Sequence, residues 1–173
     1  RVYGEWLFQQ TGGTTSVGTD LMMGTNYRSS TLLDPMEWII SGNSHLSIGG
    51  NVQLGYVYDG NSAHPGTNND GRITLDGSKG SGGDVTVGGN WWQTGPHAAN
   101  NAWGELQGVI DAAAIATATD MRKVIVTGNV TFDSGSLLLP AFDPLATPTA
   151  GTWTLLTWSG SLTNNGLTLD PAT

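Results

Sequence analysis

Ser47-Ile48-Gly49-Gly50-Asn51-Val52-Gln53-Leu54-Gly55 is the clearest copy of a phrase that recurs four times in this chain. The other copies are Ser16-Val17-Gly18-Thr19-Asp20-Leu21-Met22-Met23-Gly24, Thr86-Val87-Gly88-Gly89-Asn90-Trp91-Trp92-Gln93 and the degraded Val126-Thr127-Gly128-Asn129-Val130-Thr131-Phe132. Successive aliphatic anchors, Val17, Ile48, Val87 and Val126, are offset by 31, 39 and 39 residues. Offsets of this size are typical of stacked supersecondary units that bury their apolar faces against one another.

Each copy has the same internal order. The anchor faces inward, and Gly-Gly or Gly-Thr then turns the chain, which we attribute to the ease with which glycine adopts positive φ. An Asn or Asp follows, and two apolar residues then flank one outward residue, which is the period of a strand. Stacking in register would place four of these polar residues in equivalent turns, where we expect turn chemistry rather than metal binding: Asp20, Asn51, Asn90 and Asn129.

Composition narrows the class of protein. Gly accounts for 26 of 173 residues and charged residues for only 12%, so short strands joined by tight turns are favoured over helices. The net charge is −8 and no basic run is present, which disfavours nucleic acid and anionic membranes as partners. Cysteine is absent, which excludes disulfides and thiolate metal sites, and no stretch is long and apolar enough for membrane insertion.

We therefore predict a single all-β domain over residues 1–173, with repeats near 16–24, 47–55, 86–93 and 126–132. The favoured architecture is a right-handed parallel β-helix, a solenoid. At roughly 20 residues per coil, the chain would form about eight coils, and strands ~4.8 Å apart would make a rod ~40 Å long. An antiparallel β-sandwich or jelly roll is the alternative that the same short strands allow.

Residues that carry chemistry are sparse. The three glutamates, Glu5, Glu37 and Glu105, are widely separated, so we expect no paired carboxylates and no enzyme activity. One polar loop offers hard oxygen ligands for calcium, from Asp59, Asn68, Asn69 and Asp70. This loop lacks the terminal acidic ligands of a full calcium-binding pattern, so an ordinary turn is the competing interpretation. No other cofactor is expected.

The last third of the chain contains Lys123–Leu139, Gly151–Gly160 and Asn165–Asp170. Together with the phrases SIGGNVQLG and TVGGN, it resembles the closing repeats of bacterial autotransporter-passenger-type proteins, including those with PEP-CTERM sorting tails. The resemblance implies a secreted or surface-displayed parallel β-helix with no cofactor and no catalytic residues. Such segments usually continue into another strand after a phrase like Leu167–Thr173, whereas this sequence stops there.

Aromatic residues are the best candidates for binding. Trp91 and Trp92 are adjacent, so in a strand they point to opposite faces and one of them is exposed. Packing in the core or against a partner chain is the favoured role of the tryptophans, and stacking on sugars is the alternative; the candidate contacts are Trp91, Trp92 and Trp103. A module that binds or cleaves surface polysaccharide is therefore the alternative function.

The leading function is a non-enzymatic structural protein of the bacterial cell surface, secreted and built into a fibre, filament, surface layer or adhesin. Solenoid ends leave strand edges unpaired, and we find no charged or Pro-rich protection at either end. We expect copies of the chain to associate through these edges. The residues assigned to this contact are Val2, Tyr3, Trp6, Phe8, Leu167 and Leu169. Folding back of the N-terminal segment onto its own coil is the competing arrangement.

Overall fold

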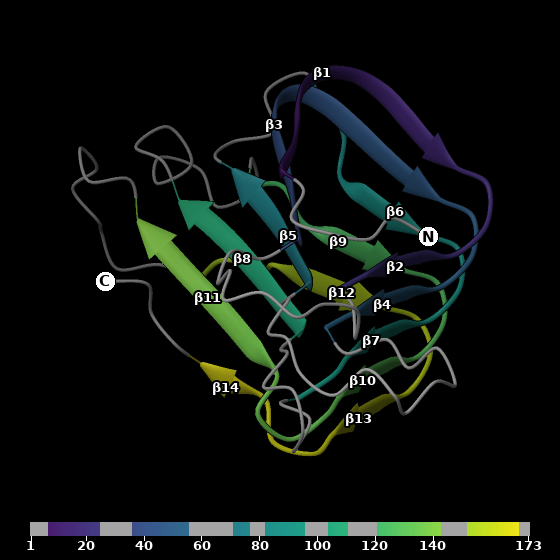
Figure 1. Ribbon diagram of the computed structural model, residues 1–173, viewed down its shortest axis with the longest axis vertical. Helices are drawn as coiled ribbons and strands as arrows, with labels where there is room; N and C mark the ends of the chain where they lie inside the picture. The colour runs from purple at the N-terminus through teal and green to yellow at the C-terminus, as the bar shows by residue number, and fades with distance from the viewer. Residues whose placement is uncertain are drawn as a thin grey trace, which may run out of the picture.

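The computed structural model describes residues 7–24, 36–55, 71–76, 82–95, 104–110, 121–142 and 152–169. Every regular element in these ranges is a β-strand (Figure 1). The strands are β1 Leu7–Val17, β2 Leu21–Met23, β3 Met36–Ile48, β4 Val52–Leu54, β5 Gly71–Asp76, β6 Val85–Val87, β7 Trp91–Gln93, β8 Gly104–Ile110, β9 Val124–Val126, β10 Val130–Phe132, β11 Leu137–Phe142, β12 Leu156–Trp158, β13 Leu162–Asn164 and β14 Thr168–Leu169.

All described strand pairs are parallel, and the strands stack as the coils of a β-solenoid. A five-stranded sheet has the order β13-β10-β7-β4-β2, and a nine-stranded sheet contains the other strands. In Figure 1 the stack runs from β1 at the top to β13 and β14 at the bottom. The predicted parallel β-helix is confirmed, and the antiparallel sandwich is excluded because parallel pairing joins successive coils.

The spacing between copies of the phrase equals the register offset between neighbouring coils. Asp20 and Asn51, 31 residues apart, occupy equivalent turns of neighbouring coils, and Asn51 and Asn90 repeat this relation at 39 residues. One copy of the phrase therefore marks one whole coil. The expected coil of roughly 20 residues was wrong, because residues 31 or 39 apart occupy equivalent turns of neighbouring coils. A five-stranded stack at ~4.8 Å per strand is only ~19 Å long, half the expected rod.

The nine-stranded sheet covers two of the three faces of each coil. The first half of β3 pairs with β5, whereas Ser47 and Ile48 at its end pair with β6. Gly42, with φ of 56°, lies between these halves and lets the strand bend around the corner. β3 is nevertheless one continuous strand, because the ladder to β1 continues across the corner.

The core consists of inward-facing rows that cross the coils. One row contains Val52, Trp91 and Val130, and another contains Ile48, Val87 and Val126; all six side chains are buried. The predicted burial of the anchors is thus confirmed for Ile48, Val87 and Val126, and for Val52 and Leu54 beside them. Val17 is only half-buried, because it belongs to the first coil.

One buried cation joins three coils at a corner. The guanidinium of Arg122 donates to the carbonyl oxygens of Gly42 at 2.7 Å, Ser44 at 2.5 Å and Gly83 at 2.6 Å. Burial lowers the pKa of Arg122, and the negative charges of two nearby aspartates act in the opposite direction. The Ser44 carbonyl also accepts from the Gly83 N–H at 3.2 Å, so the guanidinium adds to the backbone pairing at this corner and does not replace it.

Candidate functional site

A row of side-chain hydrogen bonds runs along one corner of the solenoid. Backbone N–H groups donate to the side-chain oxygen one coil earlier: Asn51 to Asp20 at 2.7 Å, and Asn90 to Asn51 and Asn129 to Asn90 at 2.9 Å each. The N–H of Ser161 donates to Asn129, also at 2.9 Å, and ends the row. We call Asp20, Asn51, Asn90, Asn129 and Ser161 the asparagine ladder. The prediction that its first four members occupy equivalent turns is confirmed.

Every backbone-to-side-chain bond of the ladder runs from an N–H to the side chain one coil earlier. The residues at the two ends of the ladder match the hydrogen bonds available there. The Asn51 side chain also donates to Asp20 Oδ1 at 3.1 Å, so this carboxylate accepts twice and has no donor that needs a partner. Ser161 at the last position donates its hydroxyl to Asn129 Oδ1 at 3.0 Å. Backbone bonds run both ways: Val52 N–H donates to Asn90 O in the next coil at 2.8 Å, and Gly89 N–H donates to Gly50 O in the previous coil at 2.8 Å. Each turn is therefore joined to the next in both directions.

The glycines before the ladder residues are required by close approach. A Cβ on Gly89 would lie 2.6 Å from Oδ1 of Asn51, and one on Gly128 would lie 2.5 Å from Oδ1 of Asn90. Neither glycine has positive φ; the repeat glycines that do are Gly24 and Gly55, at the ends of two phrases. The explanation of the Gly-Gly turn by positive φ was therefore wrong.

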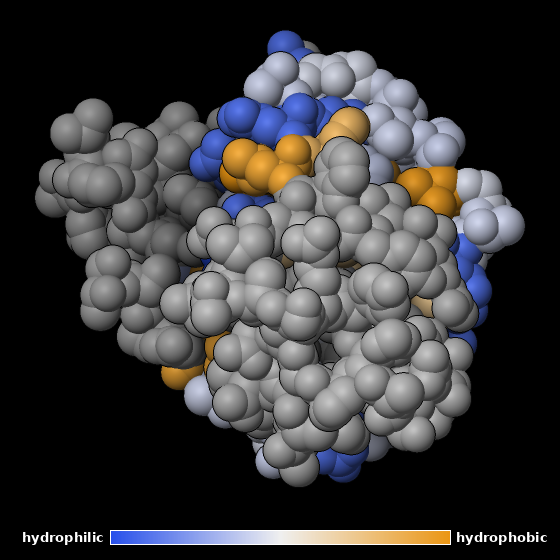
Figure 2. All heavy atoms as spheres, in the orientation of Figure 1, coloured by the Kyte–Doolittle hydropathy of each residue, from blue (hydrophilic) through white to orange (hydrophobic). Residues whose placement is uncertain are grey.

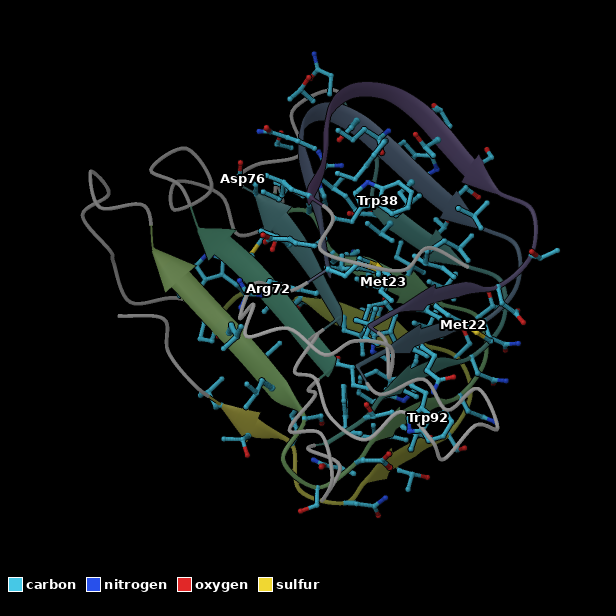
Figure 3. All side chains as sticks on the ribbon, in the orientation of Figure 1. Met22, Met23, Trp38, Arg72, Asp76 and Trp92 are labelled. Atoms are coloured by element: carbon cyan, nitrogen blue, oxygen red, sulfur yellow. The ribbon has the colours of Figure 1, made fainter. Side chains whose placement is uncertain are left out.

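A groove lies beside the first half of the ladder. It has a volume of about 260 Å³ and is lined by Asp20, Met22, Asn51, Val52, Gln53, Asn90 and Trp92. Met22, Gln53 and Trp92 are register partners on β2, β4 and β7, so they form an outward-facing row parallel to the ladder. Figure 3 shows Met22 and Trp92 on the same side of the molecule.

The two adjacent tryptophans have different environments. Trp92 is 43% exposed, and its indole N–H donates to Asp133 Oδ2 at 2.7 Å, which fixes the orientation of the ring. Trp91 is fully buried and donates to Gln93 Oε1 at 2.9 Å. The prediction that one of the pair is exposed is confirmed. The assignment of Trp91 as a surface contact is corrected, because its ring lies in the core.

The last coil exposes residues that belong to inward rows. Leu162 continues the row of Val130 and is 43% exposed, and Trp158 continues the row of Val126 and is 40% exposed. Of the two leucines assigned to self-association, Leu169 is exposed and Leu167 is half-buried. In the described part of the chain, this end therefore exposes three large apolar side chains, Trp158, Leu162 and Leu169, that no coil covers.

The other end begins with β1, which pairs along its length with β3 of the same chain. Phe8 lies edge-on against Trp38, with ring centroids 4.8 Å apart, yet both Phe8 and Leu7 remain at least half exposed. Figure 2 shows hydrophobic atoms gathered near the start of β1. From Leu7 onward, the N-terminal segment therefore takes the folded-back arrangement.

Several predicted site residues lie outside the described residues: Val2, Tyr3, Trp6, Trp103, Asp59, Asn68, Asn69 and Asp70. Within the described ranges, no group of three or more His, Asp or Glu side chains is placed to hold a metal ion. Those ranges also contain no helix with the length and apolarity needed to cross a membrane.

Sequence reasoning missed the fifth copy of the phrase, Trp158-Ser159-Gly160-Ser161-Leu162-Thr163-Asn164. Its register with β10 makes it the last rung of the ladder. The available signal was the Gly160 before the polar position, because a Cβ there would collide with the side chain of Asn129. The copy was hidden by Ser161 in place of Asn.

The groove was missed as well, because Met22, Gln53 and Trp92 meet only through register.

Comparisons with known proteins add no family to this description. No protein-family model, no curated protein and no solved structure matches the chain.

Proposed function

We propose that this chain is a non-enzymatic structural protein of the bacterial cell surface, whose copies stack end to end into a fibre or surface layer. The observation that carries the proposal is the exposure of inward-row residues at the last coil. Leu162 and Trp158 occupy the same positions as Val130 and Val126, which are fully buried one coil earlier. Among the described strands, none pairs with the outer side of β12 or β13, which accounts for the difference in exposure.

The first coil offers a matching surface. Val17 and Leu21 begin the two rows that Trp158 and Leu162 end, and both are only half-buried. Among the described strands, β2 and β13 each pair on one side only, so both present unpaired backbone groups. Parallel addition of one copy's first coil to another's last coil would pair these edges and bury both apolar surfaces.

This contact joins two different surfaces, so it is head-to-tail. A heterologous contact that does not close into a ring produces a filament. The ladder is compatible with the junction, since the Ser161 hydroxyl oxygen of one copy can accept from the Asp20 N–H of the next, as ladder oxygens do within the chain. Low charged content and the absence of cysteine support an exported bacterial product, as the resemblance to autotransporter-type repeats does.

The proposal is tested by placing a charged side chain at the last coil, where the junction would form. Leu162→Lys should abolish assembly, because the lysine would be buried without a partner at the junction. The matched control is Ile125→Lys, since Ile125 is an exposed apolar residue on the side of the solenoid rather than at its end. Sedimentation velocity and negative-stain imaging report the assembly state. Equal assembly of the two variants, or a wild-type protein that stays monomeric at high concentration, would refute the proposal.

The N-terminal segment is tested separately. Deleting Arg1–Phe8 removes the start of β1 and the Phe8–Trp38 contact. We expect weaker assembly of the truncated chain, because its first coil would present a shorter edge. Assembly equal to that of the full chain would show that this segment takes no part in the junction.

A further inference from the structure

We propose that the groove beside the asparagine ladder binds a neutral polysaccharide chain, laid along the stack of coils. The groove lies on the side of the solenoid, over β2, β4 and β7, and not at its ends. Binding there is independent of the end-to-end contact, so the two proposals stand or fall separately.

The lining has the two kinds of group that a sugar ring requires. Trp92 offers an exposed aromatic face for the C–H face of a sugar, and its bond to Asp133 holds the ring in place without a ligand. Asn51 and Asn90 each use one amide N–H within the ladder, at 3.1 Å, and a primary amide carries a second that points away from that bond. These donors suit the hydroxyl groups at the edge of the sugar.

The charges of the groove and of the whole chain favour a neutral sugar over an acidic one. Asp20 is the one ionisable residue in the lining, and its Oδ1 already accepts two bonds from Asn51. No lysine or arginine lines the groove, and the chain carries a net charge of −8. A uronate, sulfate or phosphate group would enter without a counter-charge and against this field. A neutral glycan carries no charge, so neither the missing counter-charge nor the negative field of the protein opposes its binding.

The shape of the groove fits an elongated ligand better than an enclosed small molecule. The volume of about 260 Å³ is below the roughly 300–1,000 Å³ of pockets that enclose a small ligand. Two parallel rows line the groove, one from Met22, Gln53 and Trp92 and one from the ladder, and both advance by ~4.8 Å per coil. A chain of sugars lying along these rows would repeat its contacts from coil to coil.

The experiment titrates the full chain with neutral hexasaccharides of β-1,4-glucan, β-1,4-xylan and β-1,4-mannan, and with hexagalacturonate as the charged comparator. Isothermal calorimetry measures affinity, and tryptophan fluorescence reports the environment of the exposed ring. We expect at least one neutral hexasaccharide to bind, with a dissociation constant on the order of 10⁻⁴ to 10⁻³ M, and hexagalacturonate to bind more weakly.

Three variants locate the site. Trp92→Ala should weaken binding by roughly tenfold, since an aromatic stacking contact of this kind contributes about that factor. Trp92→Phe, which keeps a ring face, should retain most of the affinity. Ile125→Ala removes an exposed apolar side chain from another face and should bind as the wild type does. Thermal melting confirms that each variant folds.

The outcomes are decisive in both directions. The proposal is overturned if no neutral hexasaccharide binds at millimolar concentration, if hexagalacturonate binds as tightly as the neutral ligands, or if Ile125→Ala weakens binding as much as Trp92→Ala does. Binding that persists in Leu162→Lys would show that the groove acts without assembly, as its position on the side of the stack requires.

Discussion

Substitution of one repeat glycine tests the close stacking of the turns. A Cβ on Gly88 would lie 2.6 Å from the carbonyl oxygen of Gly49 in the coil before it, whereas ordinary contacts begin at 3.4 Å. Gly18 occupies the same turn position in the first coil, and a Cβ there meets nothing within 4 Å. Neither glycine has positive φ, so alanine is free of backbone strain at both sites. The pair therefore differs only in the presence of a preceding coil.

The magnitude follows from the geometry. Relieving the Gly88 contact requires a local separation of about 0.8 Å, which would lengthen the Gly88 N–H···O=C Ile48 bond from 2.8 Å beyond hydrogen-bond range. Overpacking costs about 1–3 kcal/mol and a lost hydrogen bond about 1 kcal/mol, so about 2–4 kcal/mol is the upper bound on the loss of unfolding free energy in Gly88→Ala. It is an upper bound because Thr127 and Ser159 carry a Cβ at the same turn position of later coils. Gly18→Ala should be neutral, or stabilising by up to about 1 kcal/mol, because alanine restricts the unfolded chain.

Urea unfolding followed by tryptophan fluorescence and far-UV circular dichroism measures both values. At this chain length each kcal/mol corresponds to about 2–4 °C in melting temperature, so Gly88→Ala should melt at most about 4–16 °C lower. Both variants are measured at a low protein concentration, to keep assembly from contributing. Equal destabilisation of the two variants would refute the reasoning, because it would mean that the coils do not approach each other as closely as the structure shows.

Four further outcomes are expected from the same structure. Ile48→Ala should cost about 2–4 kcal/mol in urea unfolding, because it empties a fully buried position; a cost near zero would contradict the stacked core. Arg122→Met should lower stability by about 3 kcal/mol, since three hydrogen bonds from the guanidinium to backbone carbonyls are lost, and a neutral effect would show that those bonds are dispensable. Asn90→Ala should cost about 1–2 kcal/mol and Asn129→Ser less, because Ser161 already serves as a rung; the reverse order would contradict the ladder. Raising the salt concentration from low levels should promote assembly by screening the net charge of −8, and salt-induced dissociation seen by sedimentation would contradict an apolar junction.

The architecture was predictable because its signal is local and repeated. Each phrase combines an aliphatic anchor, a close-packed turn and a short strand, and the offsets of 31 and 39 residues between phrases reappear as the register of the turns. The offsets between phrases equal the length of a coil, so the expectation of roughly 20 residues per coil disagreed with the repeat itself. The continuity of β1 and β3 is not visible in the sequence: glycines such as Gly13 and Gly42 suggest turns, but here they bend a strand around a corner.

In the candidate site, too, some features follow from the local sequence and others only from the tertiary structure. The sequence by itself determined that Asp20, Asn51, Asn90 and Asn129 occupy equivalent turns and that one of Trp91 and Trp92 is exposed, because both follow from local geometry. Only the tertiary structure decided which tryptophan faces outward, and that it lies beside Gln53 and Met22 from coils far away in the sequence. It also decided that Leu162 and Trp158 are exposed although they occupy inward positions. Burial in a solenoid depends on whether a neighbouring coil is present, and no local pattern carries that information.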